Sequence, residues 1–101
     1  MDRLARLPTK PILGLEVPVA TTRRARLLGL AGLPREDAGI GLLLPRCRSI
    51  HTFGMRFDID ILFLDKDGAV VERHAGVGPR RILCCRRADS VLELVVGGRP
   101  G

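Results

Sequence analysis

The residues able to do chemistry in this 101-residue chain are concentrated in one short window. It contains one histidine, one methionine, two aspartates and all three phenylalanines of the chain: His51, Phe53, Met55, Phe57, Asp58, Asp60 and Phe63. Large apolar side chains beside a few oriented polar groups are typical of a ligand pocket. The same composition is typical of a small hydrophobic core whose polar groups bond to the backbone. The sequence leaves both interpretations open.

Asp60 is the most informative residue of this window, because it lies between two isoleucines in an apolar strand. An unpaired buried carboxylate is costly, so we expect Asp60 to have a partner. If its strand pairs with the preceding one in one register, His51 faces Asp60 and its imidazole is tuned by the carboxylate. A slip of one residue places Thr52 or Arg48 there instead. We favour a structural role, in which Asp60 ties down the loop 53–57.

The three cysteines, Cys47, Cys84 and Cys85, are odd in number and include an adjacent pair, which predicts free thiols in a reducing compartment. In a regular strand Cys47 and His51 lie about 13 Å apart. That distance excludes a direct thiol–imidazole hydrogen bond. The chain has no recognised catalytic motif, so whether it is an enzyme stays open. We expect no metal site and no cofactor.

The net charge is +6 and the sequence pI is about 10.6, with arginine far outnumbering lysine. Clustered arginines can bind phosphates. Binders of single-stranded nucleic acid also interleave aromatic residues with such charge, and these clusters have none, so nucleic acid is not an expected partner. The absence of Asn and Gln suits either a thermophile or a GC-rich genome. The arginine clusters are residues 23–26, 46–48, 80–81 and 86–87.

The longest apolar runs are too short to span a membrane. The stretch 12–20 follows a basic start, but Glu16 and Pro18 interrupt it, which does not suit a signal peptide. We therefore expect a cytoplasmic protein, and we favour a monomer.

The pattern of elements predicts a single domain over residues 1–101, in which residues 1–11 form a loose lead-in. One helix is expected from Thr21 to Ala31, where a capping threonine precedes an apolar stripe. Short runs with turn signals between them predict strands at 12–17, 40–44, 46–52, 58–65, 69–74, 81–85 and 91–96. The strand 58–65 is apolar on both faces and is expected at the centre of a sheet. The fold class is therefore mostly β, a compact β-sandwich or barrel-like domain with one short N-terminal α-helix.

The run CRSIHTFGMRFDIDILFLDKDG, from Cys47 to Gly68, resembles the signature of the family called domain of unknown function 192, an uncharacterised ancient conserved region. The stretches 20–30 and 88–98 resemble its early helix and late strand. The resemblance implies a β-sandwich-like fold, no established activity, and marked residues at His51, Thr52, Met55, Asp60 and Gly68. Unlike many members, this chain shows no export signal and no further C-terminal segment, so its last strand is expected at an open sheet edge.

Taken together, the sequence predicts a module that binds a small molecule or a protein. The predicted pocket lies near His51 and Asp60, with Thr52, Phe53 and Met55 as its other candidate residues. An enzyme that uses His51 and Asp60 is the alternative. Weak phosphate or nucleic-acid binding through the arginine clusters is a further alternative.

Overall fold

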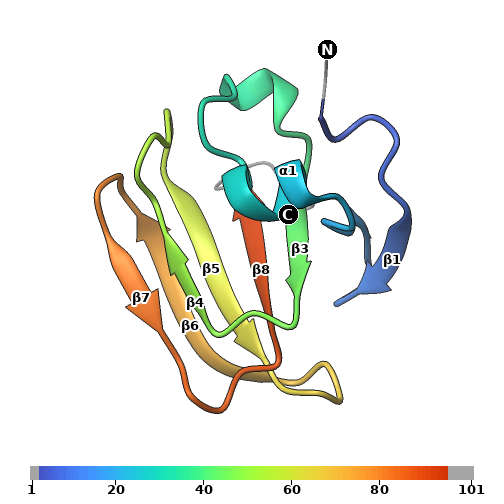
Figure 1. Cartoon of the computed structure of the whole chain (residues 1–101). Helices are drawn as coiled ribbons and strands as arrows, with labels where there is room; N and C mark the ends of the chain where they lie inside the picture. Colours follow the sequence, from blue (N-terminus) through green and yellow to red (C-terminus); the bar gives the residue numbers. More distant parts are fainter. Residues whose placement is uncertain (1–2, 96–101) are drawn as a thin grey trace.

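The computed structural model of the chain describes residues 3–95. A four-stranded antiparallel sheet, in the order β3-β8-β5-β6, forms the middle layer (Figure 1). Two smaller sheets, β1-β2 and β4-β7, complete the fold. The elements are β1 (Thr9–Ile12), β2 (Leu15–Pro18), α1 (Arg23–Leu28), a 3₁₀ turn (Arg35–Asp37), β3 (Gly41–Pro45), β4 (Ser49–His51), β5 (Ile59–Leu64), β6 (Val70–Val77), β7 (Ile82–Cys84) and β8 (Ser90–Val95). The predicted mostly β, sandwich-like fold with one short helix is confirmed.

Each face of the middle sheet carries its own apolar cluster. On β5, Ile59, Ile61 and Phe63 point to one face, where the inner side chains of β4, β7 and α1 cover them. Leu62 and Leu64 point to the other face, where the β1-β2 hairpin covers them. Every residue of β5 is buried, as its two-sided apolar pattern predicts.

The N-terminal segment differs from the predicted loose lead-in. Residues 9–18 form a hairpin whose two-residue turn has positive φ at both Leu13 and Gly14, 52° and 80°. Such a turn matches the twist of paired strands, but a leucine in it gives no turn signal in the sequence. A single strand at 12–17 was therefore expected where the chain actually turns back.

The helix is shorter than the predicted span from Thr21 to Ala31. Thr22 caps its start, since the Thr22 hydroxyl accepts a hydrogen bond from the Ala25 N–H at 3.0 Å. The helix ends at Leu28 because Gly29 turns to φ +54°. At Gly29 an added Cβ would lie 3.0 Å from a carboxylate oxygen of Glu93 on β8. The packing of this turn against β8 therefore sets the helix end.

The last strand is also placed differently from the prediction. An open edge was expected there, but β8 lies between β3 and β5 and pairs with both. A tight turn follows β5 at residues 65–68, where the Asp65 carboxylate accepts hydrogen bonds from the N–H groups of Asp67 and Ala69. All three cysteines are free thiols; Cys84 is exposed and Cys85 is buried, as neighbours in an extended segment should be.

Candidate functional site

Thr52, the central residue of the predicted site, is a completely buried clamp between two segments. Its hydroxyl donates to the Gly78 carbonyl and accepts from the Arg81 N–H, both at 2.8 Å. Its own N–H donates to the Arg81 carbonyl at 2.9 Å. These hydrogen bonds of Thr52 therefore hold the end of β4 against the start of β7.

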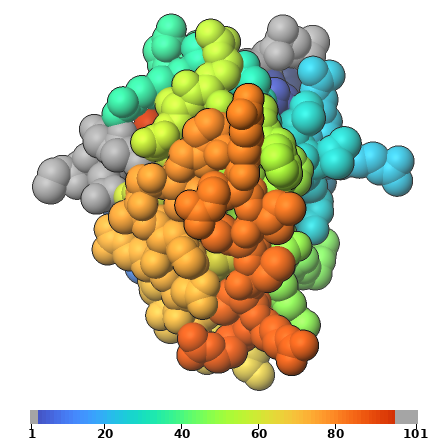
Figure 2. Space-filling view, turned by 90° about the vertical axis from the view of Figure 1, so that its left-hand side faces the viewer, coloured from blue at the N-terminus to red at the C-terminus, as the bar shows by residue number. Residues whose placement is uncertain are grey.

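This clamp fixes the two neighbours of Thr52 at the surface. His51 is exposed and Phe53 is 48% exposed, and their ring centroids lie 5.6 Å apart. Across the β4-β7 sheet His51 is directly opposite Ile82, which is 65% exposed. We call the surface formed by His51, Phe53 and Ile82 the β4-β7 patch. Figure 2 looks onto this side of the molecule, where the orange atoms around β7 lie on the outside.

Asp60 is only 2% exposed and has a structural partner. In the β5-β6 pairing Ile59 faces Val77 and Ile61 faces His74, so β6 has a bulge opposite Asp60. The Asp60 carboxylate accepts a hydrogen bond from the Gly76 N–H in that bulge at 2.8 Å. The bulge thus explains why this strand carries a buried acid.

The strand pairing keeps His51 and Asp60 on different sheets. β4 pairs with β7, whereas β5 pairs with β6 and β8. Both registers considered from the sequence assumed that β4 pairs with β5, and this assumption is wrong. Met55, the remaining candidate, is 8% exposed and belongs to the main apolar cluster. Of the five candidate residues, only His51 and Phe53 present their side chains to the surface.

Replacing Asp60 with alanine is expected to cost about 1–3 kcal/mol of stability, because it removes a buried carboxylate and leaves the Gly76 N–H in the bulge without its acceptor. The exposed Asp58, two residues earlier, is the matched control, and its alanine variant should change stability by less than about 0.5 kcal/mol. His51→Ala should be as mild as the control. Urea unfolding midpoints measure all three; an Asp60→Ala variant as stable as the control would contradict this assignment.

Glu93 is a buried acid that the sequence analysis did not single out. It is 3% exposed on β8, beneath the end of α1, and its Oε1 atom has no hydrogen-bond partner among residues 3–95. Burial raises the pKa of Glu93 from 4.5 to about 7, although a hydrogen bond from the Leu30 backbone and the positive charge of Arg3 act in the opposite direction. The available signal was an acid inside the apolar run VLELVV.

The Arg3 side chain lies near Glu93 and bonds to the segment that follows α1. Its guanidinium donates to the Gly29 carbonyl, at 2.9 Å from Nη2, and also to the Ala31 carbonyl. These bonds supply donors to two carbonyls of the segment that directly follows α1. A perturbed acid in an open cleft would suggest catalysis. Glu93 is instead enclosed by protein, so its raised pKa bears on stability.

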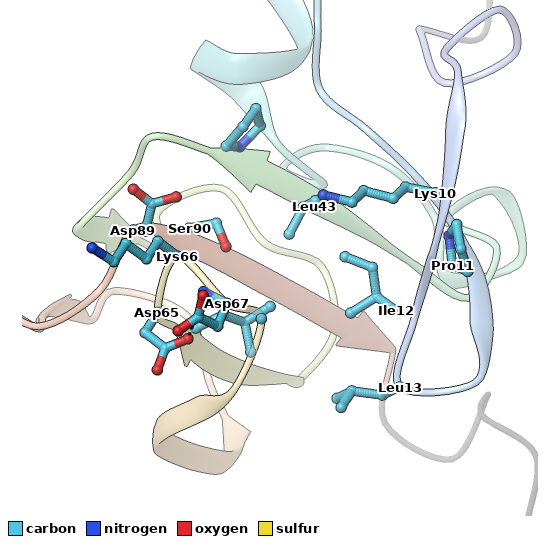
Figure 3. Close-up of a pocket in the computed structure, with 13 residues that line it drawn as sticks. Lys10, Pro11, Ile12, Leu13, Leu43, Asp65, Lys66, Asp67, Asp89 and Ser90 are labelled. Carbon is cyan, nitrogen blue, oxygen red and sulfur yellow. Dashed lines mark hydrogen bonds between the residues drawn. The ribbon is translucent and has the colours of Figure 1, made fainter.

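A cavity of about 360 Å³ lies on the other side of the molecule, between the β1-β2 hairpin and the turn after β5 (Figure 3). Lys10 and Ile12 approach from the hairpin, and Asp67 and Asp89 lie across from them. Its walls carry both signs of charge, so they specify no single ligand charge. None of the five candidate residues lines this cavity.

Among residues 3–95 no three His, Cys, Asp or Glu side chains are grouped so that they could hold a metal ion. Over the same part of the chain, no helix has the length and apolar character needed to cross a bilayer.

The fold and the site together define a small β-sandwich-like domain. Of its candidate residues, Thr52, Met55 and Asp60 are buried, whereas His51 and Phe53 are exposed. Residues 7–98 match the family called domain of unknown function 192 (DUF192), described as an uncharacterised ACR. The chain belongs to this family, as its central run indicated. No curated protein matches the sequence.

The chain is similar in fold to a solved structure. It is a crystal structure of a protein of unknown function from Novosphingobium aromaticivorans. The two chains are 20% identical, with a TM-score of 0.62, and the alignment covers 96% of this chain and 86% of the other. At this identity the likeness supports the fold alone.

Proposed function

We propose that the domain is a protein-binding module and that the β4-β7 patch is its docking surface. The observation that carries the proposal is the continuity of three exposed side chains, His51, Phe53 and Ile82, on a backbone that the buried Thr52 clamp holds in place. Exposed aromatic and aliphatic groups on a rigid scaffold are typical anchors of protein interfaces. Such a surface is already arranged before a partner arrives, which lowers the entropic cost of binding.

The charge around the patch indicates the chemistry of the partner. Arg80 and Arg81 directly precede Ile82, and Arg56 follows Phe53 closely; all three arginines are exposed. Asp58 is the exposed acid nearest in sequence to Phe53. An apolar centre with a basic rim favours an acidic protein segment that carries one or two large apolar anchors.

An enzyme that uses His51 and Asp60 together is less well supported, because the Asp60 carboxylate is engaged by Gly76 within a different sheet. The free thiols suit a reducing compartment, so we place this interaction in the cytoplasm. The domain would bind as a monomer.

Selection of peptides from a random displayed library tests the proposal. Peptides selected on the native domain should combine acidic residues with an aromatic or aliphatic anchor. They should lose at least about tenfold in affinity for the double variant Phe53→Ser/Ile82→Ser, which corresponds to about 1.4 kcal/mol. Backbone amide signals of residues 51–53 and 81–83 should shift on binding.

The matched control is Leu13→Ser/Val70→Ser, which removes two other exposed apolar side chains, 54% and 41% exposed. It should bind the selected peptides as tightly as the native domain does. Equal losses in the two double variants, or selected peptides without acidic residues, would contradict the proposal.

A further inference from the structure

Two arginine-containing turns lie side by side at the end of the β4-β7 sheet away from the patch. The first, between β3 and β4, contains Arg46 and Arg48; the second, between β7 and β8, contains Arg86 and Arg87. Both connections run along the lower side of the molecule in Figure 1. The sequence separates the two pairs by about forty residues, so their proximity is a product of the fold. We call these four residues the arginine end.

Backbone hydrogen bonds hold the two turns together. The Cys85 N–H donates to the Arg48 carbonyl at 2.9 Å, and the Cys47 N–H donates to the Asp89 carbonyl at 3.0 Å. Nε of Arg48 adds a bond to the Ala88 carbonyl at 3.1 Å. The arginine end is therefore anchored to a fixed backbone.

The backbone of Arg46 is also constrained. Arg46 adopts a φ of +49°, which is uncommon for a residue other than glycine. The Arg26 side chain reaches across from α1 and donates to the carbonyls of Pro45 and Arg46. Because this turn is already ordered, a ligand that binds there pays a smaller entropic cost.

The positive charge of the arginine end is not neutralised within the described structure. In residues 3–95 no Asp or Glu oxygen lies within 4.0 Å of a guanidinium nitrogen of these four residues. Arg46, Arg48 and Asp89 line a hollow of about 410 Å³. Counting four arginines and the single acid Asp89 leaves a local charge of +3.

We propose that the arginine end binds the phosphate groups of a small phosphorylated molecule. Guanidinium groups present paired N–H donors that match phosphate oxygens. Arg46 and Arg48 line the hollow, and Arg86 and Arg87 are exposed on the turn whose backbone is bonded to theirs, although Arg87 also donates to the Val71 carbonyl at 3.0 Å. The described aromatic side chains lie elsewhere: Phe53 belongs to the patch, Phe63 is fully buried, and Phe57 follows the patch on the loop before β5. A surface without a stacking platform favours phosphate over nucleobases.

The test measures binding of sodium tripolyphosphate to the native domain by calorimetry and by thermal unfolding. A ligand that binds only the folded state raises the unfolding midpoint. Tripolyphosphate should therefore raise the midpoint above its value in sodium chloride of equal ionic strength. The variant Arg46→Gln/Arg86→Gln should bind at least about tenfold more weakly, with an unchanged midpoint in the absence of phosphate. Neither substituted side chain makes a hydrogen bond or ion pair in residues 3–95 that its loss would break.

The control Arg6→Gln/Arg24→Gln removes the same net charge from exposed positions outside the arginine end. It should bind tripolyphosphate within about twofold of the native domain. Equal weakening of both double variants would reduce the effect to net charge and overturn the proposal, as would a midpoint no higher than in sodium chloride. Tighter binding of single-stranded oligothymidylate that both double variants weaken would indicate a sequence-blind nucleic-acid surface instead. Peptide binding at the β4-β7 patch should not change in the Arg46→Gln/Arg86→Gln variant, so the two proposals can fail separately.

Discussion

Replacing Glu93 with glutamine is expected to remove a loss of stability that the native domain shows as the pH rises from 4.5 to about 7. In this window the unfolded chain has Glu93 ionised, whereas the folded chain retains its proton because burial raises the pKa of this carboxyl to about 7. Folding therefore takes up a proton, and the free energy of unfolding falls as the pH rises. Above pH 7 both states are ionised and the full cost of the buried charge is present.

The expected size follows from the shift in pKa. A displacement from 4.5 to about 7 corresponds to about 3 kcal/mol across the whole window, and to about 2–3 kcal/mol between pH 5 and pH 8. Urea unfolding at these two pH values gives the change in the free energy of unfolding for each protein. The change for the native domain should exceed the change for Glu93→Gln by about 2–3 kcal/mol. The exposed Glu36 supplies the control, because Glu36→Gln should keep the native pH dependence. Parallel pH profiles for the native domain and Glu93→Gln would show that Glu93 is not the titrating group.

Replacing Gly41 with alanine is expected to destabilise the domain by about 3 kcal/mol or more, because the added methyl group has no room. An ideal Cβ at Gly41 would lie 2.1 Å from the backbone carbonyl oxygen of Glu93 on the neighbouring strand β8. Gly41 also has a φ of +153°, which residues with a side chain rarely adopt. Strands β3 and β8 would have to separate to accept the methyl group.

Gly39→Ala is the matched control for this substitution. Gly39 also has a positive φ, +62°, but apart from its two chain neighbours no described residue has an atom within 4 Å of the position that a Cβ would take there. Its alanine variant should therefore cost only the backbone penalty of about 1–2 kcal/mol. Chemical unfolding of both variants separates steric overlap from backbone strain. Equal costs at Gly39 and Gly41 would mean that the close approach of β3 and β8 does not limit the residue at 41.

Local patterns predicted most of the elements. The apolar run of β5, the turn at residues 65–68 and the threonine cap of α1 each have a cause within a few residues of the chain, so they could be recognised from the sequence. The end of α1 depends on Gly29 packing against Glu93, more than sixty residues later. The partner of β4 is β7, about thirty residues later. Neither dependence leaves a local signal.

The candidate site shows the same division. The sequence located the window around His51 and Asp60, because reactive and apolar residues are concentrated there. It could not separate exposed residues from buried ones, since that depends on register and a shift of one residue exchanges the two faces of a strand. Thr52 became a clamp only through its contacts with Gly78 and Arg81, which belong to a segment of the chain with no pattern in common with β4.

The position of β8 between β3 and β5 has a consequence for biosynthesis. During translation β3 and β5 are made well before residues 90–95, and neither has its β8 partner until that late segment emerges from the ribosome. Until then, two strands rich in leucine and isoleucine expose unpaired edges, a condition that favours aggregation. Pairing between strands so distant in sequence also slows folding. The nascent chain is therefore expected to depend on chaperones until β8 has been synthesised.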